Sequence, residues 1–283
     1  MSVRWLTKDI YKFVDNADGE RNIRSIARTE FIRLGRLRVE CAPAWFCRRE
    51  NMQRSSNAKT GNDLLDAMPP GSVERLTPHL EPFALVLTKP VDPVEHVYFP
   101  IAGMISVVAT MANGAAIEVG MIGREGMYSV SAILSDNLPF QSAMVQLPGH
   151  ALRLRTRLLR QEMQAEAVLQ KLLLRYTQAT LNAVAQLAAC NRLHLLEQRC
   201  ARWLLTFHDR AAVDTFPMTH EFLAMMLGVN RPGVSLAAHA LQENGLITYS
   251  HGTMSVLDRR GLETAACECY RVIQDEFSRL FAT

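Results

Sequence analysis

The 283-residue sequence lacks the short motifs of several large enzyme classes, and it has no uninterrupted apolar run of membrane-spanning length. No G-x-S-x-G, P-loop, G-x-G-x-x-G or H-E-x-x-H pattern occurs, which argues against the hydrolases, nucleotide-dependent enzymes and metalloproteases that use them. The longest apolar stretch, residues 101–122, is interrupted by Gly103, Asn113, Gly114 and Glu118. We therefore expect neither an enzyme nor a membrane protein.

Cysteines are few and scattered: the six are Cys41, Cys47, Cys190, Cys200, Cys267 and Cys269. Charged residues within the first dozen positions break any secretory signal, so we expect reduced thiols in a cytoplasmic protein. Cys267 and Cys269 fall in a segment that we expect to be helical, where residues two apart point about 200° apart. We therefore predict no metal site and no iron–sulfur cluster.

The net charge of +3 is too small to indicate a partner until the chain is divided. Residues 1–56 hold 12 basic and 7 acidic side chains and have weak periodicity. Three interpretations of this N-terminal extension stay open. It is a basic or disordered arm, it contains a short helix over 24–39, or it lies upstream of a translation start at Met52.

Residues 57–155 are predicted to form a sensor domain. A helical spacing of apolar residues over 64–80 gives way to short runs with strand-like composition at 83–87, 94–99, 104–111, 116–121 and 143–147. Asn113-Gly114 between two of these runs predicts a hairpin with a type I′ turn. Many short strands punctuated by glycine and proline favour an antiparallel β-roll of the jelly-roll kind.

Residues 156–190 are predicted to form a long helix. One of its faces repeats with alternating steps of four and three residues and consists of Leu169, Leu173, Tyr176, Thr180, Ala183 and Leu187. This face either packs on the helix's own domain or forms a two-stranded dimer seam, and we favour the seam.

Residues 218–257 hold the most specific pattern in the chain. Ala224, Gly228, Val234 and Ala237 have the spacing of a helix-turn-helix, in which a small residue lies where the second helix crosses the first. Thr219 is a cap for the first helix, and Asn230 or Arg231 begins the second. Two β-type runs at 246–249 and 254–257 follow, which predicts a wing.

From about residue 60 to 260 the sequence resembles the Crp/Fnr superfamily of bacterial transcription regulators, named after the cyclic-AMP receptor and the fumarate-nitrate regulator. The resemblance implies an α+β fold with a cyclic-nucleotide-binding-like β-roll, a dimerisation helix over 156–190, a winged helix-turn-helix over 191–260 and a C-terminal helix over 261–283. It also implies a homodimer that reads a palindromic operator in double-stranded DNA, with RNA polymerase as a further partner.

Seven residues are expected at the DNA. Arg231 matches a family arginine that reads guanine, and Ser235 and His239 are further contacts from the same helix. Phosphate contacts are assigned to the two helix starts, at Thr219, His220, Asn230 and Gly233.

The charge of the predicted reading domain is low. Arg231 is the only Lys or Arg in residues 218–257, so we expect Arg192, Arg199 and Arg202 to add phosphate neutralisation. The alternative is an effector-binding protein whose helix-turn-helix contacts proteins or has lost specific DNA binding.

The sensor departs from the cyclic-nucleotide binders of the family. The matching stretch is Gly123-Arg124-Glu125, with Arg124 where the family has glutamate, and the phosphate-binding pair becomes Gln141-Ser142. A neutral Gln141 cannot replace a guanidinium in phosphate binding. We therefore predict no cofactor and no cyclic nucleotide in its usual pose, and leave the effector open.

Overall fold

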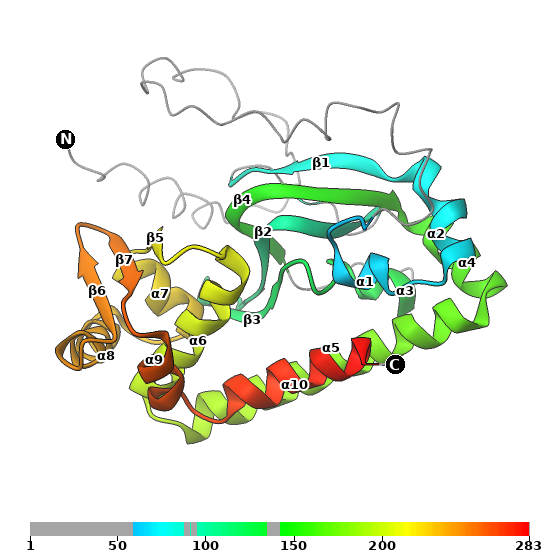
Figure 1. Cartoon of the computed structure of the whole chain (residues 1–283). Coiled ribbons are helices and arrows are strands. Elements are labelled where there is room, and N and C mark those ends of the chain that lie inside the picture. Colours follow the sequence, from blue (N-terminus) through cyan, green and yellow to red (C-terminus); the bar gives the residue numbers. More distant parts are fainter. Residues whose placement is uncertain (1–58, 88–90, 92–94, 135–141, 283) are drawn as a thin grey trace, which may run out of the picture. The chain divides into compact units, whose positions relative to one another are not determined.

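The computed structural model describes residues 59–87, 91, 95–134 and 142–282 (Figure 1). All of them belong to one of the two compact units of the chain, residues 56–283. The N-terminal extension predicted for residues 1–56, with its helix over 24–39, lies outside the described residues. Gln141 also lies outside them.

The sensor is built on a four-stranded antiparallel sheet with the order β1-β4-β2-β3. The strands are β1 (Glu81–Leu85), β2 (His96–Thr110), β3 (Ala116–Ile122) and β4 (Ser142–Arg155). β2 joins two predicted strands, and β4 continues through Pro148 and Gly149, where we expected it to end. The chain bends there without breaking: β2 has register shifts around Gly103, whose φ is +85°, and a Cβ on Gly149 would collide with the Ala102 carbonyl group.

The hairpin predicted at Asn113-Gly114 joins β2 to β3, but its turn is not type I′. A type I′ turn needs positive φ at both central residues, and of these two only Gly114 has it, at +83°. Met111 N donates to Ala115 O at 2.8 Å, and Ala115 N donates to the Asn113 side chain at 3.1 Å. The asparagine therefore stabilises a wider loop through its side chain.

Short helices precede and interrupt the sheet: α1 (Asp63–Asp66), α2 (Pro70–Leu76), a 3-10 turn (Thr77–His79) and α3 (Ser131–Leu134). Asn62 caps α1 and also donates from its side chain to Pro100 O and Gly126 O. α2 begins at Pro70, because proline is well tolerated where the first amides of a helix have no partner.

The predicted helical middle consists of three helices, α4 (Thr156–Ala165), α5 (Ala167–Leu193) and α6 (Leu196–Ala211). Glu166 breaks the first junction with extended backbone, and its side chain accepts a hydrogen bond from Val168 N at 3.2 Å. α5 is fixed to the sensor through Tyr176, whose hydroxyl accepts from Met127 N at 2.9 Å and donates to Met127 O at 3.0 Å. The long helix therefore starts as part of the sensor core.

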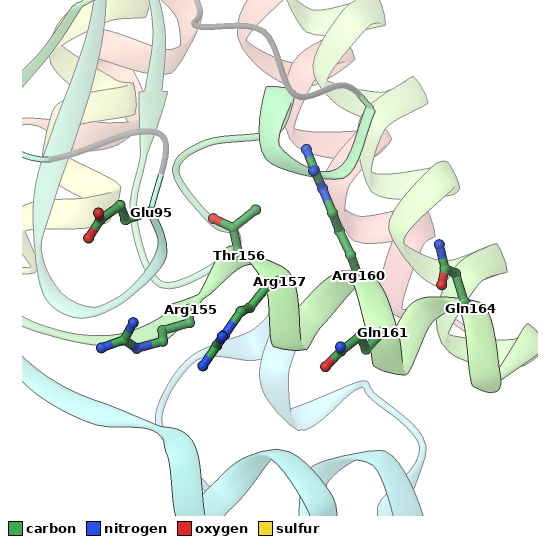
Figure 2. A pocket seen from close by; sticks show the side chains of 7 residues that line it. All are labelled: Glu95, Arg155, Thr156, Arg157, Arg160, Gln161 and Gln164. Atoms are coloured by element: carbon green, nitrogen blue, oxygen red, sulfur yellow. The ribbon is translucent and has the colours of Figure 1, made fainter.

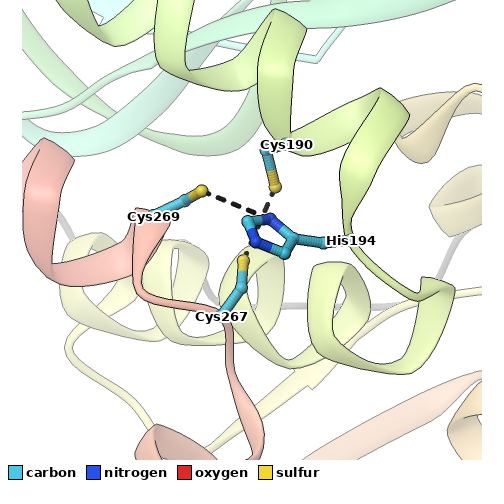
Figure 3. Close-up of side chains that lie close together, drawn as sticks. All are labelled: Cys190, His194, Cys267 and Cys269. Atoms are coloured by element: carbon cyan, nitrogen blue, oxygen red, sulfur yellow. Dashed lines mark hydrogen bonds between the residues drawn. The ribbon is translucent and has the colours of Figure 1, made fainter.

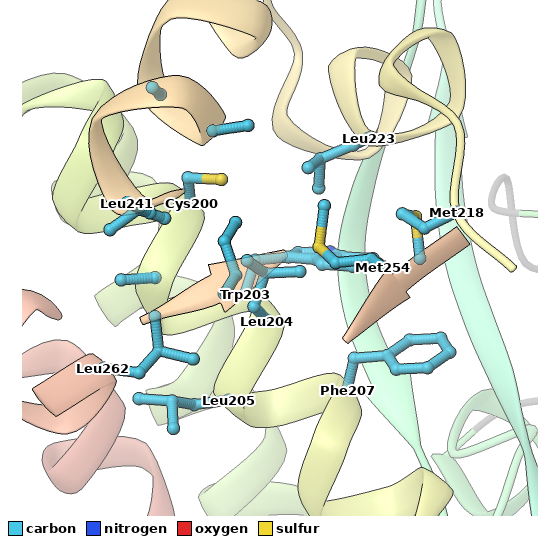
Figure 4. Packing of buried hydrophobic residues seen from close by; sticks show 14 of the residues in the cluster. Cys200, Trp203, Leu204, Leu205, Phe207, Met218, Leu223, Leu241, Met254 and Leu262 are labelled. Atoms are coloured by element: carbon cyan, nitrogen blue, oxygen red, sulfur yellow. The ribbon is translucent and has the colours of Figure 1, made fainter. Parts of the chain in front are cut away.

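The C-terminal part contains α7 (His220–Leu227), α8 (Arg231–Glu243), α9 (Arg259–Ala265) and α10 (Cys269–Phe281). A three-stranded sheet has the order β5-β7-β6, with β5 (Thr215–Pro217), β6 (Ile247–Ser250) and β7 (Thr253–Val256). The last two strands are the predicted wing. These elements surround a core centred on Trp203, Leu204 and Phe207 of α6 (Figure 4), and the same core includes Met104 of the sensor.

Two helices, and not one, occupy the end of the chain. α10 runs along α5 (Figure 1), where Asn182 donates to Glu276 at 2.9 Å and Arg175 donates to the Arg279 carbonyl at 2.9 Å. Among the helices within the described ranges, none combines the length and apolar character that a membrane crossing requires.

Candidate nucleic-acid interface

The first helix of the motif, α7, is bounded as its sequence predicts. Thr219 Oγ1 accepts a hydrogen bond from Phe222 N at 3.1 Å, and Gly228 ends the helix with φ +65°. Gly228 also lies against the sensor: a Cβ there would come within 2.5 Å of Ile117 Cδ1 on β3. The turn between the two helices is therefore in contact with the sensor domain.

The second helix, α8, has one buried side and one exposed side. Asn230 caps it by accepting a hydrogen bond from Gly233 N at 2.8 Å, and Pro232 occupies its first turn. Its buried side chains are Val234, Ala237, Ala238 and Leu241. The small residues at its centre allow α6 to pack closely, which leaves the opposite side of α8 free to enter a groove.

The exposed side of α8 includes side chains of different chemistry. The Arg231 side chain is 64% exposed, and its Nε donates to Glu221 Oε1 at 2.8 Å. Leu236 is 72% exposed, and His239 lies 3.3 Å from Glu243 on the same helix. This side therefore offers a guanidinium, an apolar group and an imidazole to a ligand.

Two of the predicted DNA contacts, His220 and Ser235, interact with each other within the protein. His220 Nδ1 and Ser235 Oγ form a hydrogen bond of 2.9 Å that joins α7 to α8. The His220 ring stacks on Tyr249 of the wing, with centroids 4.1 Å apart, and burial lowers its pKa. Neutral His220 thus connects both helices and the wing.

The positive charge expected from the preceding helix is mostly absent from the surface. Arg192 is exposed, but Arg199 and Arg202 are buried, with 7% and 5% of their surface accessible. Arg199 Nη2 donates to Leu227 O at 2.6 Å and so caps the end of α7. The expectation that Arg199 and Arg202 neutralise phosphates is wrong, because both side chains point into the protein.

Of the predicted effector residues, the four that the structure describes do not converge on one site. Arg124 is exposed and pairs with Asp63 at 3.2 Å, and Ser142 donates to Val108 O within the sheet at 3.4 Å. Glu125 accepts from Arg210 of α6 at 2.6 Å, and the buried Gly123 donates its amide to the same carboxylate at 3.1 Å. The stretch Gly123-Arg124-Glu125, which matches the cyclic-nucleotide binders in sequence, thus contacts α6.

Two surface hollows are candidates for an effector site. A hollow of about 440 Å³ at the start of α4 is lined by Arg155, Arg157, Arg160 and Glu95 (Figure 2), and contains none of the predicted effector residues. A second, of about 240 Å³ between the sensor, α6 and α10, includes Arg124 and Glu125. The first hollow is open and mainly polar, and the second is mainly apolar but open to solvent, so neither is the enclosed, apolar kind of cavity that binds small molecules well.

Part of the predicted dimer seam lies on the side of α5 that faces the chain's own sensor. Leu169, Leu173 and Tyr176 are fully buried in the chain's own sensor core, so they cannot meet a second chain. Thr180, Ala183 and Leu187 are half-buried. The large apolar residues that α5 does expose are Val168, Leu174, Leu181, Val184 and Leu193.

Two residues that join the sensor to the DNA-binding domain were missed from the sequence. Glu118 on β3 is buried and accepts a hydrogen bond from Trp203 Nε1 at 3.0 Å. A carboxylate within the longest apolar stretch was the signal for it.

Four residues that are able to ligate a metal lie together: Cys190, His194, Cys267 and Cys269. The prediction of no metal site assumed that Cys267 and Cys269 share a helix. That premise is wrong, because α10 begins at Cys269 and Cys267 lies in the preceding turn. Because Cys267 lies outside the helix, the 200° separation of helical neighbours two residues apart does not apply, and both thiols lie in the same cluster.

Residues 198–265 match the family model of the Crp-like helix-turn-helix domain. No curated protein sequence matches the chain.

Solved structures show the same fold at low sequence identity. A Crp/Fnr-family transcriptional regulator from Eubacterium rectale is 16% identical, with a TM-score of 0.58 over 71% of this chain and 96% of that one. FixK2 from Bradyrhizobium japonicum is 15% identical, with a TM-score of 0.57 over 66% and 98%. The c-di-GMP responsive regulator CLP from Xanthomonas campestris is 17% identical, with a TM-score of 0.51 over 66% and 99%.

The matched domain begins on α6 and spans the helix-turn-helix and the wing, and the shared fold adds the sensor and the long helix. Residues 198–265 are therefore a Crp-like helix-turn-helix domain, and the chain shares the fold of solved regulators of the Crp/Fnr family.

Proposed function

We propose that the chain acts as a homodimer that reads a palindromic operator with α8, under control of the sensor. The observation that carries the proposal is the two-sided character of α8. One side is buried against α6, while Arg231, Leu236 and His239 lie on the exposed side. Arginine recognises guanine in the major groove, and an apolar side chain contacts the thymine methyl group.

The proposed dimer uses the exposed face of α5. Leu174, Leu181 and Ala188 are exposed and seven residues apart, and Val184 is exposed between them. A seven-residue repeat keeps one stripe facing a partner helix along a left-handed coiled coil. Two copies related by a two-fold axis would present their α8 helices to half-sites about 34 Å apart.

Effector control is proposed to act through the contacts between sensor and DNA-binding domain. Arg210 of α6 is paired with Glu125, and Gly228 of the reading motif rests on Ile117 of β3. An effector that binds one arrangement of these contacts better than another would shift the position of α8. As a regulator that acts on DNA, the protein is expected in the cytoplasm, with RNA polymerase as a further partner.

The decisive experiment is selection of an operator from a random duplex library, followed by binding measurements at several salt concentrations. Arg231→Ala is expected to weaken binding to the selected operator by about 5- to 150-fold, since an arginine–guanine contact contributes about 1–3 kcal/mol. The control is Arg271→Ala, which removes an exposed arginine of α10. If wild type and Arg231→Ala bind all duplexes equally, α8 does not read DNA.

The second candidate is a motif that contacts a protein. It is favoured by the exposed Leu236 and by the burial of Arg199 and Arg202, which leaves the surface near α8 with little positive charge. The same selection separates the two functions. A protein-contacting motif would enrich no sequence and would show no salt dependence that follows phosphate neutralisation.

A further inference from the structure

Two segments that are distant in sequence bring four metal-ligating side chains to one point (Figure 3). Cys190 lies in the last turn of α5, and His194 is the residue that follows the helix as its C-cap. Cys267 lies between α9 and α10, and Cys269 is the first residue of α10. Their ligand atoms, one from each residue, all lie within 4.8 Å of one another.

The spacing of these atoms is close to the edges of a metal tetrahedron. Cys190 Sγ and Cys267 Sγ are 3.5 Å apart, and Cys269 Sγ and His194 Nδ1 are also 3.5 Å apart. With Zn–S near 2.3 Å and Zn–N near 2.0–2.1 Å, a tetrahedral site has edges of about 3.8 Å between sulfurs and about 3.5 Å between sulfur and nitrogen. Only small shifts are needed to place an ion at the centre.

The surroundings of the four ligands have the features of a structural metal site. All three cysteines are buried, so no ligand position is left open to water. His194 Nε2 pairs with Glu268 Oε1 at 3.2 Å, which would hold the ring with Nδ1 toward the metal. Gln186 donates to Cys269 Sγ at 3.0 Å and orients that sulfur.

Nearby charge favours sulfur in its anionic form. Three thiolates, one neutral imidazole and a divalent ion carry a net charge of −1. Buried Arg202 lies close enough to Cys190 for its positive charge to favour anionic sulfur in the cluster. The buried arginine, which does not serve DNA, has a counter-charge in this cluster.

We propose that Cys190, His194, Cys267 and Cys269 form a closed tetrahedral site for a zinc-class divalent ion. Three sulfurs and an imidazole are soft ligands in the set that structural zinc sites use, whereas magnesium and calcium require oxygen. The ion would tie the end of α5 and the turn into α6 to the start of α10. It would thus fix the direction in which the DNA-binding domain leaves the long helix.

The first test is the metal content of the full chain, produced with zinc and kept reduced. The chain carries Cys41→Ser and Cys47→Ser, so that these two N-terminal thiols cannot contribute to metal binding. We expect one zinc per chain, and less than one-tenth of that after Cys190→Ser/Cys267→Ser. The matched control is Cys200→Ser, which removes a buried thiol outside the cluster and should leave loading unchanged. Reconstitution with Co²⁺ alone should give the visible bands of tetrahedral sulfur coordination, weakened in His194→Gln.

A milder variant covers the case in which the double substitution unfolds the protein. Glu268→Gln keeps all four ligands, and loss of such an outer partner lowers metal affinity about 10- to 100-fold. Its control is Glu276→Gln on the same helix, which should not change zinc affinity in competition with a chelator.

Metal content is measured without DNA, so its outcome is independent of the proposed function. Wild-type protein that takes up neither zinc nor cobalt would overturn the proposal, as would Glu268→Gln and the cysteine variants binding as tightly as wild type. Protein purified under reducing conditions from zinc-supplied cells that held a Cys190–Cys267 disulfide and no metal would overturn the proposal as well.

Discussion

Trp203 Nε1 donates a hydrogen bond to Glu118 Oε1 across 3.0 Å and so joins α6 to β3. The other carboxyl oxygen, Oε2, lies 2.7 Å from Ser106 Oγ, which is itself in a hydrogen bond with Gln146 Oε1. Ser106 has a single hydroxyl proton and cannot donate to both oxygens. Both contacts of Ser106 are satisfied if protonated Glu118 donates to Ser106 and Ser106 donates to Gln146, or if the Gln146 amide is turned so that its Nε2 donates to Ser106.

Glu118→Gln is expected to make stability less dependent on pH. Burial raises the pKa of Glu118 to about 7, from 4.5. Between these values the folded state binds more protons than the unfolded state, so the free energy of unfolding falls as pH rises through this window. Glutamine should raise the free energy of unfolding at pH 8 by about 1–3 kcal/mol and change it little at pH 4.5.

Denaturant unfolding at both pH values measures this effect. Glu81→Gln is the control, since the Glu81 side chain is 46% exposed and pairs with Arg153 at the surface. Equal stability of wild type and Glu118→Gln at pH 8 would show that the carboxylate is accommodated without cost.

The helix-turn-helix was predictable because its signals are local. Thr219, Gly228 and Asn230 act through hydrogen bonds or φ angles within a few residues of themselves, and the structure uses Thr219 and Asn230 as caps and Gly228 as the turn. The wing follows for the same reason. Pattern and capping chemistry are readable wherever a residue's partner is its near neighbour in sequence.

What could not be predicted depends on partners that are distant in sequence. Leu173 and Leu174 are adjacent leucines on one helix, and only the packing of the sensor against α5 decides that the first is buried and the second exposed. From the sequence alone Arg202 is expected to contact DNA, and only the packing of α6 shows that its side chain is buried. Likewise Cys190 meets Cys267, 77 positions further along the sequence, only when the intervening chain has folded.

Arg210 and Glu125 are expected to be strongly coupled. Their side chains are only 13% and 19% exposed and lie 2.6 Å apart. Arg210→Ala should lower the free energy of unfolding by about 3 kcal/mol, because removing one partner leaves the other charge buried. A double-mutant cycle with Glu125→Gln measures the coupling.

The Arg153–Glu81 pair provides a comparison within the same chain. It has a similar distance, 2.7 Å, but its side chains are 33% and 46% exposed. Its coupling energy should not exceed about 1 kcal/mol. If the two cycles gave equal values, burial would not be what strengthens the contact between sensor and α6.

Leu181→Asp is expected to make the protein monomeric at micromolar concentration. Leu181 is 58% exposed at the middle of the proposed dimer face, and a carboxylate there would be buried without a partner in the dimer. Light scattering after gel filtration gives the mass directly. Leu193→Asp changes another exposed leucine of α5 that is off the face, and should stay dimeric.

Glu221→Gln is expected to tighten operator binding. Glu221 holds Arg231 Nε at 2.8 Å, and this interaction must be exchanged for a guanine contact. Removing the carboxylate's charge should raise affinity by a few-fold at low salt, an effect that fades as salt screens it. Glu243→Gln makes the same change of charge elsewhere on the exposed side, so a similar gain there would assign the effect to net charge.

Gly228 is constrained by two parts of the protein, the turn between α7 and α8 and the sensor strand β3. Its backbone, with φ +65°, is one that other residues adopt at a cost of about 1–2 kcal/mol, and its missing side chain is also the space that Ile117 fills. The destabilisation caused by Gly228→Ala should therefore be only partly reversed by a second substitution. Shortening Ile117 in the sensor would relieve the collision and leave the backbone cost. Substitutions at Gly228 in the helix-turn-helix are therefore constrained by Ile117 in the sensor's hairpin, and substitutions at Ile117 are constrained by Gly228.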